Sequence, residues 1–110
     1  MSYKINFTSD FERHAKRLSK KYKSLSSDLS KLVDQLKNDP ESGTPLGNNL
    51  FKIRLRISSK GKGKSGGARV VTFLLKREEE IYLVAIYDKS EVDTLSKEQL
   101  KSYLLNAGLA

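Results

Sequence analysis

The sequence predicts an α+β fold in which a helical hairpin packs on one side of a mostly antiparallel, twisted sheet. Two stretches of helical periodicity fill the N-terminal half, and three segments of strand character begin at Leu50. Ser96 and Gln99 then form a capping box that opens a short final helix. A chain of 110 residues supports one core. We therefore expect a single domain over residues 1–110 with the element order βααβββα.

The first strand and the first helix are indicated by a change of period. Tyr3–Phe7 alternates apolar and polar residues, which is typical of a strand with one buried face. Ser9 and Glu12 fit a capping box at the start of the helix that follows. Its apolar stripe recurs at helical spacing and consists of Phe11, Ala15, Leu18 and Tyr22.

A second helix follows the serine-rich segment Ser24–Ser27 and ends at Asn38-Asp39-Pro40. Its apolar face consists of Leu25, Leu29, Leu32, Val33 and Leu36. The short connection between the two helices favours an antiparallel hairpin. Glu41–Asn49 contains proline, glycine and asparagine, and we expect it to be a loop.

The second half of the chain predicts three strands. Leu50–Ile57 alternates strictly between apolar and cationic residues, and Ala68–Lys76 is rich in valine, phenylalanine and leucine. Arg77–Glu80 forms a charged turn. Ile81–Tyr87 is nearly all apolar, which predicts a central strand covered on both faces.

The charge of the chain is distributed unevenly. The formal net charge is +8, and no acidic residue lies between Glu41 and Glu78. Nine cations lie there: Lys52, Arg54, Arg56, Lys60, Lys62, Lys64, Arg69, Lys76 and Arg77. This cation block is typical of a nucleic-acid binder. Cations on a solvent-facing sheet edge, which discourage edge pairing, are the plainer interpretation of some of them.

Several classes of protein are disfavoured by composition. The chain has no cysteine and one histidine, so we expect no metal and no cofactor. It has no apolar run that could cross a bilayer and no signal-peptide core, so we expect a cytoplasmic protein with no membrane partner. The run Gly63-Lys64-Ser65 resembles the end of an ATP-binding loop, but it leads into a strand and not into a helix, which excludes that motif.

The glycine-rich segment Lys60–Arg69 indicates a phosphate site. Arg69 lies where this segment becomes strand, and its guanidinium group can bind a phosphate through two donors. Hairpin geometry would bring Tyr87, Asp88 and Lys89 close to it. RNA cleavage by the neighbouring 2′-OH needs correct geometry and stabilisation of negative charge, which cations provide. The general acid and base remain open among a lysine of the cluster, Tyr87 and Asp88.

Three runs of sequence resemble the RelE/HigB family of bacterial toxins, and its HigB-like branch most. They are Phe51–Arg56, Lys62–Val70 and Ile81–Glu91, followed by the Leu95–Leu100 helix start. The resemblance covers the whole chain. It implies a microbial-RNase-like (RelE) fold, a metal-free mRNA endonuclease acting in the A site of a translating ribosome, and an antitoxin encoded beside it.

The resemblance also implies roles for particular residues. Lys52 and Arg54 match the strand cations of the family, Arg69 matches the arginine after the glycines, and Lys89 matches a basic residue after the last strand. Lys62 and Lys64 match more loosely, and Tyr87 stands in for a tyrosine that some relatives use. We expect the catalytic set to be Arg69, Lys89, Lys62, Lys64 and Tyr87. We expect the RNA-binding set to be Lys52, Arg54, Arg56, Lys60 and Asp88.

Two other functions fit the same fold. One is a ParE-like toxin that inhibits DNA gyrase and cleaves nothing, and the other is an RNA-binding module without chemistry. The Arg69 and Lys89 pair favours the nuclease over the first. For the toxin interpretation we expect an acidic, partly disordered antitoxin segment to cover the cation block, because an anionic cover relieves the repulsion among its charges.

Overall fold

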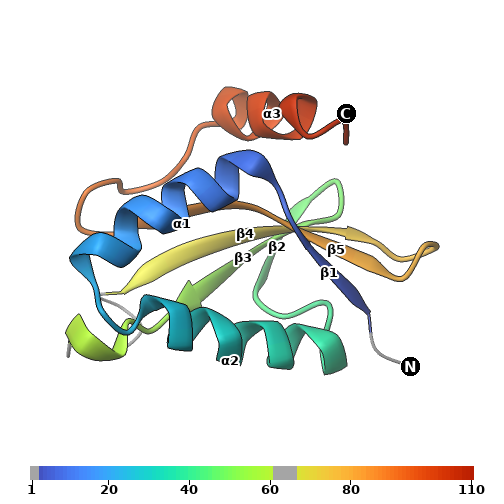
Figure 1. Cartoon of the computed structure of the whole chain (residues 1–110). Coiled ribbons are helices and arrows are strands. Elements are labelled where there is room, and N and C mark those ends of the chain that lie inside the picture. The colour runs from blue at the N-terminus through green and yellow to red at the C-terminus, as the bar shows by residue number, and fades with distance from the viewer. Residues whose placement is uncertain (1–2, 61–66) are drawn as a thin grey trace.

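Five strands form one sheet in the order β1-β5-β4-β3-β2 (Figure 1). The computed structural model describes residues 3–60 and 67–110. The strands are β1 (Lys4–Phe7), β2 (Thr44–Gly47), β3 (Leu50–Leu55), β4 (Ala68–Leu75) and β5 (Glu80–Asp88). Neighbouring strands are antiparallel except β1 and β5, which are parallel. The predicted mostly antiparallel sheet is therefore confirmed.

The helical hairpin covers one face of this sheet. It consists of α1 (Ser9–Lys21) and α2 (Leu25–Asn38). Phe11 and Leu18 from α1 share one core cluster with Leu36 from α2 and with sheet residues such as Val70 and Ile81. Both helices thus bury their apolar stripes against the same side of the sheet, as their periodicity predicts. We call this side the hairpin face.

The opposite side of the sheet carries the last helix, α3 (Lys97–Asn106), and we call it the α3 face. Leu100, Tyr103 and Leu104 pack there against a second cluster that includes Val84 and Ala85. The predicted capping box is present, because Gln99 N–H donates to Ser96 Oγ at 3.1 Å and Ser96 N–H donates to Gln99 Oε1 at 2.9 Å. β5 is therefore covered on both faces, as predicted.

A β-bulge in β5 determines on which face of the sheet the last side chains of this strand lie. Val71 pairs with Ala85 and Thr72 pairs with Leu83, so Val84 is an extra residue in β5. An extra residue reverses the alternation of the side chains beyond it. As a result, Tyr87 lies on the α3 face and Asp88 lies on the hairpin face.

Three local expectations were wrong. The predicted loop at residues 41–49 contains the strand β2, which pairs with β3 through a turn in which Asn48 and Asn49 have φ of 53° and 66°. The N-cap of α1 is Thr8 and not Ser9, because Thr8 Oγ1 accepts the Phe11 N–H at 3.2 Å. β3 ends at Leu55 and is followed by the 3₁₀ turn η1 (Ser58–Lys60), whereas we predicted a strand reaching residue 57.

Candidate active site

A row of three predicted site residues crosses the α3 face of the sheet. Arg54 on β3 lies opposite Arg69 on β4, and Arg69 lies opposite Tyr87 on β5. Directly opposed residues of antiparallel strands have Cβ atoms about 5 Å apart. We call Arg54, Arg69 and Tyr87 the transverse row. It places two guanidinium groups and a phenol side by side on one face of the sheet.

The members of the transverse row differ in their exposure. Arg54 is exposed, whereas Arg69 and Tyr87 retain 6% and 5% of their accessible surface. Arg69 Nη1 donates to the Ala68 carbonyl at 3.2 Å, which orients the guanidinium group before any ligand arrives. The sequence placed Arg69 at the edge of a loop. The structure places it within the sheet, so its charge lies in a partly desolvated position where it interacts strongly.

Lys52 and Lys89 add cations beside this row. Lys52 lies two residues before Arg54 on the same face, and it lines a groove of about 480 Å³ together with Tyr87 and α3. Lys89 N–H donates to the Gly67 carbonyl at 3.2 Å, so its backbone lies close to the start of β4. Its ammonium group binds the Asp93 carboxylate and donates to the Asp93 carbonyl at 3.1 Å. Lys89, with a smaller contribution from Lys52, lowers the pKa of Asp93. The two lysines therefore flank one carboxylate.

Asp88 and Lys60 meet on the hairpin face, away from the transverse row. The Asp88 carboxylate retains 1% of its exposure and accepts hydrogen bonds from Tyr22 Oη at 2.5 Å and Lys60 Nζ at 3.0 Å. Ser90 donates to it through both its N–H, at 3.0 Å, and its hydroxyl, at 2.7 Å. Burial alone would raise the pKa of Asp88, but these hydrogen bonds outweigh burial and hold the pKa far below its usual value.

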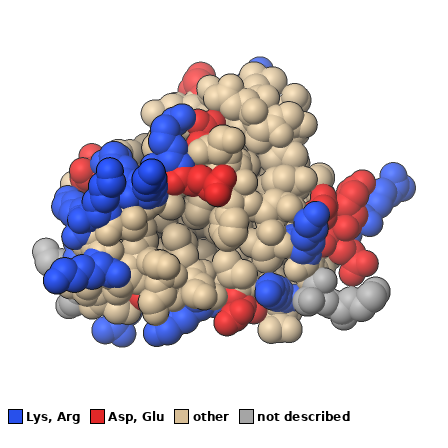
Figure 2. Space-filling view, viewed as in Figure 1, with Lys and Arg blue, Asp and Glu red and all other residues tan. Residues whose placement is uncertain are grey.

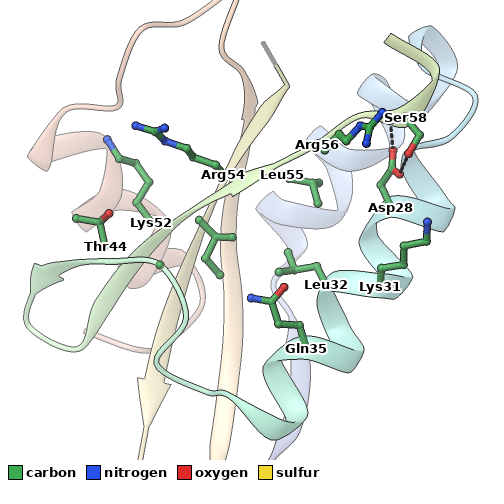
Figure 3. A pocket seen from close by; sticks show the side chains of 12 residues that line it. Asp28, Lys31, Leu32, Gln35, Thr44, Lys52, Arg54, Leu55, Arg56 and Ser58 are labelled. Atoms are coloured by element: carbon green, nitrogen blue, oxygen red, sulfur yellow. Dashed lines mark hydrogen bonds between the residues drawn. The ribbon is translucent and has the colours of Figure 1, made fainter. Parts of the chain in front are cut away.

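A second buried carboxylate, on α2, binds the other end of η1. Asp28 on α2 accepts hydrogen bonds from Ser58 N–H at 2.9 Å and Ser58 Oγ at 2.7 Å (Figure 3). It also accepts one from Ser24 Oγ at 2.7 Å. Asp28 and Asp88 thus fix the turn that leads into residues 61–66. Sequence analysis did not single out Asp28, because it lies 30 residues from Ser58 and no local pattern joins them.

The predicted site residues therefore divide by position. Lys52, Arg54, Arg69, Tyr87 and Lys89 gather on or beside the α3 face. Lys60 and Asp88 lie together on the hairpin face. Arg56 directly follows β3 and lines a second pocket (Figure 3). Lys62 and Lys64 fall outside the described residues.

Two kinds of feature are absent from the part of the chain that the structure describes. No three side chains among histidine, aspartate and glutamate come close enough together to hold a metal ion. No helix has the length and apolar character needed to cross a membrane.

Comparison with known proteins identifies the fold and the family. The chain resembles a double arginine-to-alanine mutant of the Escherichia coli toxin RelE in the free state, with a TM-score of 0.64, 16% identity and 96% of both chains covered. It also resembles a chain of the intact E. coli RelBE toxin–antitoxin complex, with a TM-score of 0.61, 18% identity, and 79% of this chain and 96% of that chain covered. The family described as the RelE toxin of the RelE/RelB toxin–antitoxin system matches residues 3–109. The chain is therefore a member of the RelE toxin family.

Proposed function

We propose that this protein is the toxin of a type II toxin–antitoxin pair and that it cleaves mRNA in the A site of a translating ribosome. Family membership supports the first part of the proposal. The transverse row, with Lys52 and Lys89 beside it, carries the second part. These side chains supply cationic donors on one face of a rigid sheet, which is the chemistry that phosphoryl transfer needs.

The proposed reaction uses the RNA's own nucleophile. The ribose 2′-oxygen attacks the adjacent phosphorus and loses its proton, the bond from phosphorus to the 5′-oxygen breaks, and that oxygen takes up a proton. The products are a 2′,3′-cyclic phosphate and a 5′-hydroxyl end. Negative charge on the phosphate oxygens grows in the transition state, and Arg69 and Arg54 stabilise it from fixed positions.

The proton carriers of this reaction belong to the α3 face. Tyr87 is the member of the transverse row that can exchange a proton, and Lys52 and Lys89 lie beside it. Asp88 does not serve as the base in this proposal, because its carboxylate is buried on the opposite face. Hydrogen bonds from Tyr22, Lys60 and Ser90 occupy its oxygens and lower its pKa, which makes it a weak base. We assign Asp88 and Lys60 the task of holding η1 in place.

A second basic surface supports a ribosomal location for the reaction. Six cations lie on α1 or directly after it: Arg13, Lys16, Arg17, Lys20, Lys21 and Lys23. Figure 2 shows Lys and Arg side chains gathered over the part of the molecule where α1 lies. Such a surface binds phosphate backbones without reading sequence. We propose that it contacts ribosomal RNA while the transverse row contacts the message.

The test of this function is cleavage in a purified translation system, with the mRNA ends mapped by primer extension. We expect the wild type to produce codon-phased cuts. Arg69→Lys keeps the charge but loses the paired donors, so we expect cleavage to fall by about 100-fold. Lys37→Ala removes an exposed cation of α2 and serves as the control that cleaves normally.

Two outcomes would contradict the proposal. If mRNA stays intact while DNA gyrase is inhibited, the protein acts as a ParE-like toxin. If the wild type binds RNA but neither cuts it nor arrests growth, it is an RNA-binding module.

A further inference from the structure

The chain folds back on itself directly after β5. Glu91 N–H and Val92 N–H both donate to the Asp88 carbonyl at 3.0 Å, which closes a turn at the end of the strand. This turn returns Asp93 to Lys89, which lies four residues earlier in the chain. The Lys89 ammonium group donates to the Asp93 carbonyl at 3.1 Å and binds the Asp93 carboxylate. Two acceptors of one residue therefore hold a predicted catalytic cation.

The Asp93 carboxylate lies beside the candidate site. Its side chain is 92% exposed, whereas the side chain of Lys89 is 33% exposed. Lys89, and after it Lys52, lower the pKa of Asp93, so both lysines lie close enough to attract its charge. Thr94 and Leu95, which follow Asp93, line the same groove as Lys52. The carboxylate is thus an anion held next to two cations of the site.

A carboxylate and an RNA phosphate compete for the same kind of donor. Both present anionic oxygens, and a lysine ammonium group binds either of them as a point charge. A phosphate that approaches Lys89 must therefore displace the Asp93 carboxylate or meet its repulsion. An exposed ion pair typically shifts an equilibrium by up to about fivefold. The contact between Lys89 and Asp93 is therefore strong enough to weaken RNA binding and too weak to prevent it.

We propose that Asp93 is an internal competitor of RNA. In the free protein its carboxylate occupies the place beside Lys89 and Lys52 that a phosphate group of bound RNA takes. Asp93 thus sets the affinity for RNA without touching the reacting atoms. This inference deepens the function proposed above and rests on it for the identity of the ligand.

Such a competitor favours RNA that a second contact already holds near the site. Free RNA must displace Asp93 through its own affinity alone. A message on the ribosome is present at a high effective concentration once α1 has bound ribosomal RNA. The same loss of affinity therefore lowers the occupancy by free RNA and has little effect on a site that the ribosome would saturate. Asp93 directs the protein away from free RNA and towards the ribosome.

The binding test uses a fluorescein-labelled RNA of seven nucleotides in which every ribose is 2′-O-methylated, and it measures fluorescence anisotropy at about 0.15 M salt. Asp93→Asn keeps the size of the side chain but removes its charge, so we expect about fivefold tighter binding. Glu98→Gln removes one charge from an exposed position on α3 and should change the affinity by less than about twofold. Equal gains from the two variants would reflect net charge alone and would overturn the proposal.

A double-mutant cycle then assigns the effect to Lys89. We expect Lys89→Gln to weaken binding, and the addition of Asp93→Asn to that variant to restore less than about twofold, because the competitor no longer has its main cation. A fivefold gain in both backgrounds, or no measurable gain in either, would overturn the proposal.

The outcome of this cycle is independent of cleavage, because the methylated RNA has no free 2′-hydroxyl group and no ribosome is present. Coupling between Asp93 and Lys89 without mRNA cleavage in the translation system would contradict the proposed function alone. Codon-phased cleavage without that coupling would contradict the role of Asp93 alone.

Discussion

Asp88 is a buried charge whose partners come from distant parts of the chain. Tyr22 and Lys60 lie 66 and 28 residues away from it, and together with Ser90 they surround its carboxylate. Removal of one member of a buried and hydrogen-bonded ion pair typically costs about 3–5 kcal/mol. This residue should therefore contribute to stability more than to chemistry.

We expect Asp88→Asn to lower the free energy of unfolding by about 3 kcal/mol at pH 7, as measured by urea denaturation. Because folding lowers the pKa of Asp88, its stabilising effect is complete above the usual carboxyl pKa and is lost as the pH falls below it. The difference between mutant and wild type should therefore shrink towards pH 3. Asp34→Asn, at an exposed carboxylate of α2, is the control that should leave stability nearly unchanged. A constant difference across this pH range would contradict the assignment.

At the scale of the elements, α3 depends on its first turn. None of its residues is fully buried, so the capping box formed by Ser96 and Gln99 should carry a large share of its stability. We expect Ser96→Ala to destabilise the protein by about 1 kcal/mol in chemical denaturation. Ser102→Ala, at an exposed position inside the same helix, should be neutral or slightly stabilising. Equal effects of the two substitutions would show that the cap is unimportant.

The elements that the sequence predicts well are those with a clear period. The amphipathic stripes of α1 and α2 and the alternation of β3 lead to the correct layers. β2 escapes prediction because Pro45 and Gly47 favour a loop, and only pairing with β3 makes an edge strand of them. The bulge at Val84 is also not predicted from the sequence. The side chains of β5 are apolar on both faces of the sheet, so a shift in the alternation leaves no trace in the sequence pattern.

The candidate site, like the fold, is predicted only in part from the sequence. Hairpin pairing of β4 with β5 predicts that Tyr87 approaches Arg69, and the register places them opposite each other. The same argument placed Asp88 beside them, but the bulge turns its side chain to the hairpin face. The role of Asp28 depends on a contact between α2 and η1, which only the folded chain creates.

At the scale of the whole molecule, two basic surfaces lie on different elements. The transverse row is built on the sheet, and the second surface is built on α1. Each phosphate contact contributes to the salt dependence of RNA binding. If the protein uses both surfaces on one ribosome, reversing the charge of the α1 surface should lower its affinity for the ribosome. The positions at which it cuts mRNA should stay the same.

We expect the double substitution Lys16→Glu and Lys20→Glu to raise the protein concentration needed for half-maximal mRNA cleavage by at least about 10-fold. The slope of the logarithm of ribosome affinity against the logarithm of salt concentration should become shallower by about two, one for each lysine that contacts a phosphate. Lys37→Glu is the single-charge control. An unchanged salt slope, measured by ribosome co-sedimentation, would exclude α1 from the interface.

The parallel pairing of the first strand with the last has a consequence for synthesis of the protein. β5 lies between β1 and β4, and it brings Tyr87 to the α3 face opposite Arg69. A nascent chain that stops before β5 leaves β1 and β4 without the strand that lies between them. Such a chain also lacks Tyr87, one of the three members of the transverse row. A transcript of this gene that is severed upstream of those codons therefore encodes a fragment that lacks both β5 and Tyr87.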